Sequence, residues 1–171
     1  MKLSLLIAIC LTELSAQTPA AKAPASIRTP ASLAQLMRGM IYPASNVIFA
    51  AQTQNPAEIK LAADPAMSPN LLTSTYGKWD AVENSSLALA EAASLLGAAG
   101  RKCSNGVDVP LKNPDWPKLV QALREAGMTA YKAAQTKNQE KIIDAANDVT
   151  AACENCHEKY REKPNLAQRC K

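Results

Sequence analysis

Apolar residues recur along much of this chain with the period of an α-helix. Within residues 115–136 they lie three and four positions apart, which is the spacing of a helix that buries one face. The positions are Trp116, Leu119, Leu123, Ala126, Ala130 and Ala134. Residues 139–160 repeat the pattern at Ile142, Ala145, Val149, Ala152, Cys156 and Tyr160. The pattern therefore predicts two amphipathic helices joined by a short connection.

Two further helices are predicted upstream, over residues 29–54 and 75–99. The first is expected to begin at Thr29, because a capping residue followed by a proline is a common helix start. Pro43 lies inside this helix. A proline there removes a backbone donor and presses on the carbonyl four residues back, so we expect a kink or break. The second helix is expected to be closed by Gly100.

No stretch of useful length alternates between apolar and polar residues as a β-strand does. Four helices of about 20 residues favour an all-α fold, an antiparallel four-helix bundle with small residues where the helices come closest. With 171 residues the chain is long enough for one such domain, which we place at residues 30–171.

The first residues have the pattern of a secretory signal peptide. Lys2 precedes a short apolar run that ends near Leu11, and a short polar stretch follows that ends with the small residue Ala16. The run is shorter than the about 20 apolar residues that a membrane-spanning helix needs. We therefore expect a signal peptide at residues 1–16, which would also remove Cys10, and a flexible leader rich in Ala, Pro, Ser and Thr at residues 17–29.

Composition adds two constraints. The net charge of +4 is mild and gives no reason to expect nucleic-acid binding, which calls for a concentrated basic face. Aromatic side chains are scarce, and Phe49 is the single phenylalanine. The core must therefore be filled by alanine and leucine, or by a group that the protein binds.

Residues 153–157 read Cys-Glu-Asn-Cys-His, a CxxCH motif. On a helix, positions three and four apart share a face, so Cys153, Cys156 and His157 are expected to point the same way. Covalent attachment of haem c needs this arrangement, because two thiols add to the vinyl groups while the adjacent imidazole reaches the iron. The motif predicts one haem c bound through Cys153 and Cys156, with His157 as axial ligand.

Other chemistries use similar residues. A thioredoxin-like dithiol would be expected after a strand, and no strand is predicted before the motif. A zinc site built from Cys103, Cys153, Cys156 and Cys170 has the right ligand number but leaves His157 unused. A disulfide between Cys153 and Cys156 is the third alternative.

Cys103 and Cys170 follow the second and fourth predicted helices. In an up-down-up-down bundle these two helices end on the same side, so a disulfide between the two cysteines is allowed. An oxidising compartment favours it. By loop entropy alone it would contribute about 4 kcal/mol.

The second axial ligand is less constrained. His157 is the single histidine, so Met, Tyr, Lys, the new amino terminus, water or no ligand remain. The first helix begins at the end where the fourth finishes, which brings Met37 and Met40 to about the right height. Met67 is expected in a loop at the other end, and Met128 in the core. Methionines on an apolar helix face are also common as packing alone.

Charged residues near the motif suggest two further contacts. Arg38 could pair with a haem propionate or simply be solvated. Basic residues after the motif, near the haem edge, could steer an acidic redox partner, although such a run is usually only a solvated end. They are Lys159, Arg161, Lys163, Arg169 and Lys171, and they are interspersed with Glu158 and Glu162.

With this helix pattern and motif, residues 30–171 resemble the cytochrome c′ class, exported four-helix bundles with CxxCH close to the end of the last helix. The resemblance implies thioether bonds to Cys153 and Cys156, a proximal His157 and a first helix that covers the opposite haem face. An apolar residue there implies five-coordinate iron that binds small gases, and a methionine implies low-spin iron suited to electron transfer. The class often places an arginine four residues before the distal position. Here Arg38 is followed at that spacing by Tyr42, so Tyr42 joins Met37 and Met40 as a candidate.

We therefore expect a soluble, exported, periplasmic monohaem cytochrome that exchanges single electrons with a redox protein partner and is not an enzyme. The first alternative is a gas-binding cytochrome, for NO or CO, with an open distal site. The second is a non-haem protein with the four-cysteine zinc site. A homodimer is compatible with the sequence.

Overall fold

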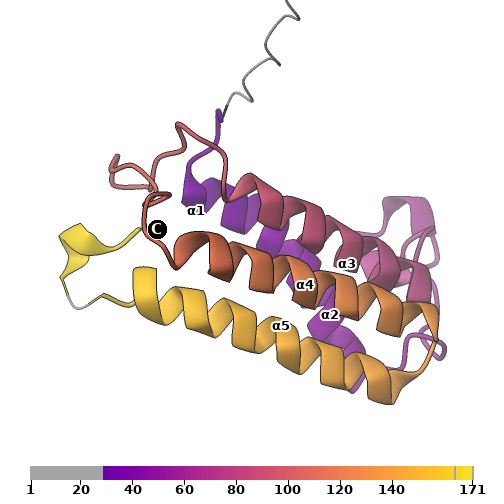
Figure 1. The fold of residues 1–171 in the computed structure, drawn as a ribbon. Helices are drawn as coiled ribbons and strands as arrows, with labels where there is room; N and C mark the ends of the chain where they lie inside the picture. The colour runs from indigo at the N-terminus through magenta and orange to yellow at the C-terminus, as the bar shows by residue number, and fades with distance from the viewer. Residues whose placement is uncertain (1–28, 164, 171) are drawn as a thin grey trace, which may run out of the picture.

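The computed structural model describes residues 29–163 and 165–170, and it forms the predicted antiparallel four-helix bundle (Figure 1). The first helix is continuous and consists of α1 (Leu33–Leu36), a π-helical turn (Met37–Ile41) and α2 (Tyr42–Thr53). It is followed by α3 (Lys78–Leu95), α4 (Trp116–Gln135) and α5 (Gln139–Tyr160). The described residues contain no strand, so the all-α prediction is confirmed. The expected signal peptide and most of the leader lie outside these residues.

The connections place the helix ends that matter for the site. Short 3₁₀ turns at Pro65–Met67 and Leu71–Thr73 lie in the loop between α2 and α3. The loop between α3 and α4 lies at the opposite end of the bundle, beside the start of α1 and the end of α5 (Figure 1). A last 3₁₀ turn at Leu166–Gln168 follows α5 on this same side. The starts of α1 and α4 and the ends of α3 and α5 therefore meet at this end of the bundle.

The boundaries of α4 and α5 agree with the prediction, but those of the first two helices are partly wrong. The first helix starts at Leu33 because Ser32 and Gln35 form a reciprocal capping box that satisfies two backbone donors, so Thr29 is not its cap. The helix expected at residues 75–99 is shorter, since Gly77 is the N-cap of α3. At its other end the carbonyl of Leu95 accepts a hydrogen bond from Arg101 Nε at 3.2 Å.

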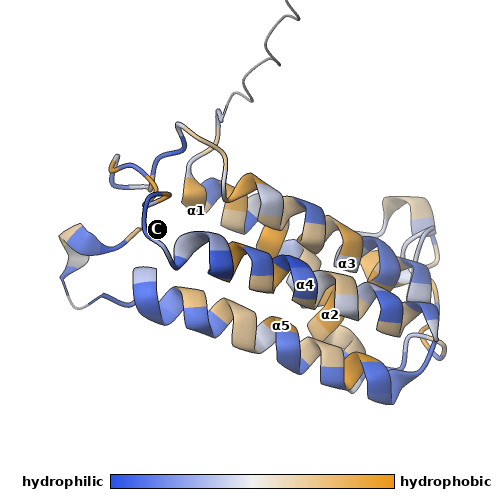
Figure 2. Ribbon diagram, viewed as in Figure 1, coloured by the Kyte–Doolittle hydropathy of each residue, from blue (hydrophilic) through white to orange (hydrophobic). Residues whose placement is uncertain are grey.

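Small residues fill much of the centre of the bundle. Figure 2 shows apolar residues, in orange and tan, interspersed with hydrophilic ones, in blue, along the helices. Fully or nearly fully buried alanines come from every helix, among them Ala51, Ala92, Ala93, Ala130, Ala134 and Ala146. The helices α3 and α4 come close together at Gly127. A Cβ atom placed there would lie 2.9 Å from the backbone nitrogen of Ala90. A side chain at Gly127 would therefore hold these two helices apart.

We predict that Gly127→Ala destabilises the fold. The new methyl group meets backbone atoms, which cannot move aside by changing rotamer, so overpacking should outweigh the gain in helix propensity and leave a net cost of about 1–2 kcal/mol. Chemical denaturation measures the free energy of unfolding. Gly97→Ala is the control, because the nearest atom to its new methyl lies 3.7 Å away. A Gly127→Ala variant as stable as the control would contradict the close packing.

Candidate functional site

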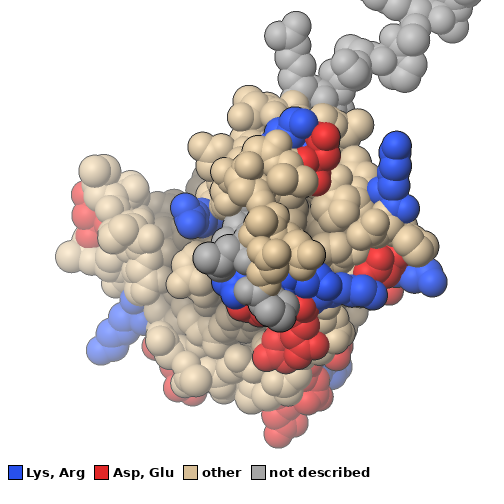
Figure 3. Space-filling view, turned by 90° about the vertical axis from the view of Figure 1, so that its left-hand side faces the viewer, with Lys and Arg blue, Asp and Glu red and all other residues tan. Residues whose placement is uncertain are grey.

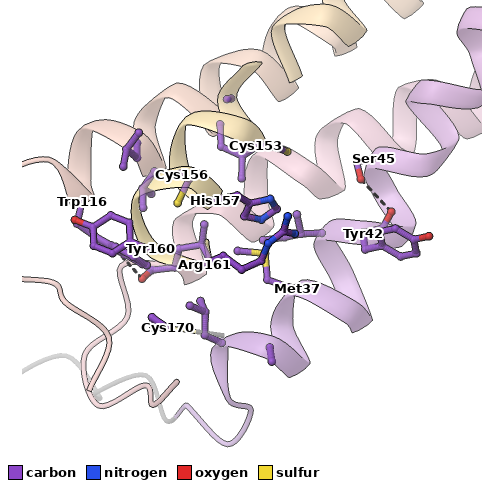
Figure 4. A pocket seen from close by; sticks show the side chains of 18 of the residues that line it. Met37, Tyr42, Ser45, Trp116, Cys153, Cys156, His157, Tyr160, Arg161 and Cys170 are labelled. Atoms are coloured by element: carbon purple, nitrogen blue, oxygen red, sulfur yellow. Dashed lines mark hydrogen bonds between the residues drawn. The ribbon is translucent and has the colours of Figure 1, made fainter. Parts of the chain in front are cut away.

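A cavity of about 350 Å³ opens at the end of the bundle where α5 finishes. Its walls are the first helix, the first turns of α4 and the last turns of α5, and its lining is mainly apolar. Figure 4 shows it from close by. The residues that the following paragraphs use are Leu33, Met37, Arg38, Ile41, Tyr42, Ser45, Trp116, Cys153, Cys156, His157, Tyr160, Arg161 and Cys170. This cavity is thus bordered by the CxxCH motif.

The motif occupies the last turns of α5 and presents its three reactive side chains to the cavity. Cys153, Cys156 and His157 are half-buried cavity residues, whereas Glu154 and Asn155 between them are exposed. The spacing of three and four residues on an α-helix causes this division. Neither cysteine is bonded to another residue.

The surroundings of the motif favour the neutral forms of its side chains. Burial raises the pKa of the Cys156 thiol to about 11 and also raises the pKa of Cys153. Burial lowers the pKa of His157, and the positive charge of Arg161 lowers it further. At neutral pH the site therefore holds two protonated thiols and a neutral imidazole, which is the form of histidine that can bind a metal.

The first helix forms the wall opposite α5, and it separates the two candidate methionines. Met37 lines the cavity, and Figure 4 shows Met37 and His157 reaching into the space between the first helix and α5. Met40 does not line the cavity and is 46% exposed. Arg38 and Tyr42 border the cavity from exposed positions, with Tyr42 64% exposed. The structure thus gives Met37, and not Met40, a place at the cavity.

The other two methionines lie away from the site. Met67 belongs to the loop between α2 and α3, at the far end of the bundle, and is 79% exposed. Met128 is a half-buried residue of α4 that does not border the cavity.

A polar cluster that the sequence did not reveal fixes the base of the cavity. The Tyr160 hydroxyl donates a hydrogen bond to Asp115 Oδ1 at 2.9 Å and accepts one from Asn113 Nδ2 at 3.3 Å. Lys159 Nζ lies 2.7 Å from Asp115 Oδ2 and holds the pKa of that carboxyl below its usual value. The Tyr160 ring packs edge-on against Trp116 at 4.9 Å between ring centres. In the sequence, the one indication that Tyr160 lies at the cavity was its position three residues after His157 on the same predicted helix.

Cys103 and Cys170 form a disulfide, with their Cα atoms 5.0 Å apart. The bond joins the loop after α3 to the segment after α5, and Cys170 is also part of the cavity wall. The Cys170 amide donates to the Tyr160 carbonyl at 3.0 Å, and Asn105 Nδ2 donates to the Arg169 carbonyl at 3.1 Å. The C-terminal segment is therefore fastened across the end of the bundle beside the motif.

This arrangement does not gather the four cysteines that a zinc site would need. Cys103 and Cys170 are bonded to each other. Across residues 29–163 and 165–170, no group of three or more His, Cys, Asp or Glu side chains is placed to hold a metal ion. The donor set at the cavity, two thiols and one imidazole on a helix face, fits covalent haem attachment better than tetrahedral zinc.

Two of the basic residues expected near the site, Lys159 and Arg161, are paired with acidic ones. Figure 3 views this end of the molecule and shows Lys and Arg side chains next to Asp and Glu side chains. Lys159 pairs with Asp115, Arg161 pairs with Glu162, and Lys102 lies 2.7 Å from Asp108. Lys171 lies outside the described residues. At Lys159 and Arg161 the positive charge is therefore balanced by a neighbouring carboxylate.

Comparison with known proteins agrees with the site. Residues 111–161 match the family model described as Cytochrome C′. The matched stretch is less than a third of the chain, but it contains the whole of α4, α5 and the CxxCH motif. The match confirms the cytochrome c′-like class expected from the sequence and supports a c-type haem cytochrome with covalently bound haem c.

Comparisons with curated proteins and with solved structures gave no significant match. Among the described helices, none is both long and apolar enough to cross a membrane.

We predict that peptide mapping without reducing agent recovers a fragment in which Cys103 is joined to Cys170. Replacing both by serine should lower the free energy of unfolding by about 2–4 kcal/mol, because the closed loop restricts the unfolded chain. Free thiols at both positions in the purified protein would contradict this pairing.

Proposed function

We propose that this protein is an exported monohaem c-type cytochrome that carries single electrons, with haem c bound to Cys153 and Cys156 and ligated by His157. The observation that supports it most is that these three side chains border one largely apolar cavity. The bound haem iron would supply the one-electron couple, and the chain would supply attachment, ligation and exclusion of water. The cytochrome c′-like class favours such a carrier, or a gas-binding protein, over a conventional enzyme.

Attachment uses the chemistry of the two thiols. Each S–H bond adds across a vinyl group, so that sulfur bonds to one vinyl carbon and the hydrogen to the other, and nothing is released. Both thiols are half-buried at the cavity edge and are kept protonated at neutral pH by burial. They are thus available for addition at the edge of a largely apolar cavity.

The axial positions follow from the two cavity walls. His157 is the single histidine, and its burial favours the neutral imidazole. On the opposite wall Met37 is the methionine that borders the cavity, so we propose it as the distal ligand. A methionine ligand raises the reduction potential relative to two nitrogen ligands, which suits an electron carrier. Arg38, at the cavity edge, is placed to pair with a propionate.

A gas-binding cytochrome is the second candidate, and one observation favours it. Ile41, which is 4% exposed, lies on the same wall of the cavity as Met37, one turn further along. If Ile41 rather than Met37 faces the iron, the sixth position is open to NO or CO.

The visible spectrum of the mature protein, reduced and then exposed to CO, separates the two candidates. We expect covalently attached haem with low-spin bands that CO does not change. A high-spin spectrum that shifts with CO would favour the gas-binding cytochrome. Protein that matures in a haem-attaching host without any covalent haem would overturn both.

We predict that Met37→Ala opens the iron and that Met40→Ala does not. The Met37 variant should lose its low-spin bands and gain CO binding, because no other methionine borders the cavity. Met40→Ala is the matched control, since it removes the same side chain three residues away from an exposed position. The same optical titration with CO measures both. Equal spectra for the two variants would exclude Met37 as the ligand.

Export and partner are part of the same proposal. The sequence of residues 1–16 has the form of a signal peptide, and an oxidising compartment such as the periplasm suits the Cys103–Cys170 disulfide. The partner would be a redox protein that docks at the exposed edge of the cavity, around Arg38 and Tyr42.

A further inference from the structure

The first helix changes its winding where it passes the cavity. The turn from Met37 to Ile41 is π-helical, whereas the residues before and after it are α-helical. The Tyr42 amide donates to the Met37 carbonyl, five residues back instead of four. Such turns inside α-helices are rare and frequently occur at functional sites.

Pro43 provides a physical cause for this winding. In an uninterrupted α-helix the residue at position 43 would donate its amide hydrogen to the carbonyl of Gly39. Proline has no amide hydrogen, and its ring would press on that carbonyl. A wider turn just before Pro43 removes the clash without ending the helix. Where a kink or break was expected, the structure thus has a local change of hydrogen-bond register.

The wider turn also decides which side chains line the cavity. In an α-helix each residue advances about 100°, so a step of four residues overshoots a full turn by about 40°. Over the three such steps from Leu33 to Ser45 this drift would reach about 120°. A π-turn advances less per residue and offsets part of the drift. Leu33, Met37, Ile41 and Ser45 accordingly all border the cavity.

The same geometry turns Met40 away. In an α-helix a residue three positions after Met37 lies only about 60° from it, so both methionines would share a face. With a smaller advance per residue, the third residue falls further short of a full turn. Met40 is accordingly 46% exposed, while Met37 is half-buried at the cavity.

We infer that Pro43 is a positioning residue: by maintaining the π-turn of the first helix, it directs Met37 toward the haem pocket and keeps Met40 in solvent. The consequence of this inference for the distal ligand rests on the proposed function. The π-turn itself can be tested without haem.

The test is Pro43→Ala. Pro43 is exposed, and alanine is the best helix former, so the variant should fold. Residue 43 regains an amide donor for the Gly39 carbonyl, the turn becomes α-helical, and Met40 rotates toward the cavity. Hydrogen peroxide oxidation followed by peptide mass spectrometry measures the exposure of each methionine. We expect Met40 to oxidise several-fold faster than Met37 in the wild type, and the ratio to fall several-fold in the variant.

The spectrum provides the functional readout. In haem-bearing Pro43→Ala we expect a fraction of CO-reactive iron, or low-spin bands that disappear when Met40→Leu is added to the same chain. Pro117→Ala is the matched control. Pro117 lies in the first turn of α4, where an amide hydrogen has no helical partner, so neither readout should change.

An oxidation ratio that is the same in wild type and Pro43→Ala would overturn the inference, because the π-turn would then persist without proline. Equal oxidation of Met37 and Met40 in the wild type would overturn it as well. Failure of the proposed function can be distinguished from failure of this inference. In the first case the protein would lack covalent haem, while the ratio of Met40 to Met37 oxidation would still report whether the π-turn is present.

Discussion

The hydrogen bond between the Tyr160 hydroxyl and Asp115 joins the end of α5 to the start of α4. The rest of the site depends on where this end of α5 is held. Cys153, Cys156 and His157 lie one to two turns before Tyr160, so any movement of the tyrosine would move the whole motif. Its ring packs on Trp116, whose indole Nε1 donates to the Leu96 carbonyl at 3.2 Å. Through these contacts the last turn of α5 is positioned against both ends of the connection between α3 and α4.

The C-terminal segment strengthens this attachment from the other side. Its last described residue, Cys170, donates its amide to the Tyr160 carbonyl and is bonded to Cys103. The loop that carries Cys103 also meets the first helix, because the Leu33 amide donates to the Lys102 carbonyl at 2.8 Å. Three elements that border the cavity are thus linked by one short path of backbone and disulfide bonds. The cavity does not rely on side-chain packing alone for its shape.

The sequence predicted what depends on local periodicity and missed what depends on contacts between distant residues. α5 was predicted at its observed bounds, because its apolar stripe is a local signal. The start of the first helix was wrong because Thr29 and Ser32 both have the form of a cap, and only the partner Gln35 favours the second. The contact of Tyr160 with Asp115 spans 45 positions and leaves no mark in the pattern.

Pro43 shows a third kind of limit. The sequence identified the residue and the physical conflict it creates, but not the way the chain resolves it. A kink, a break and a π-turn all relieve the clash between the proline ring and the Gly39 carbonyl, and they rotate the preceding residues differently. Only the arrangement of the bundle selects among them, because Leu33 is held by Lys102 on one side of the turn and Ile48 is fully buried on the other. Which of Met37 and Met40 borders the cavity was therefore undecidable from spacing, since it follows from the winding of a single turn.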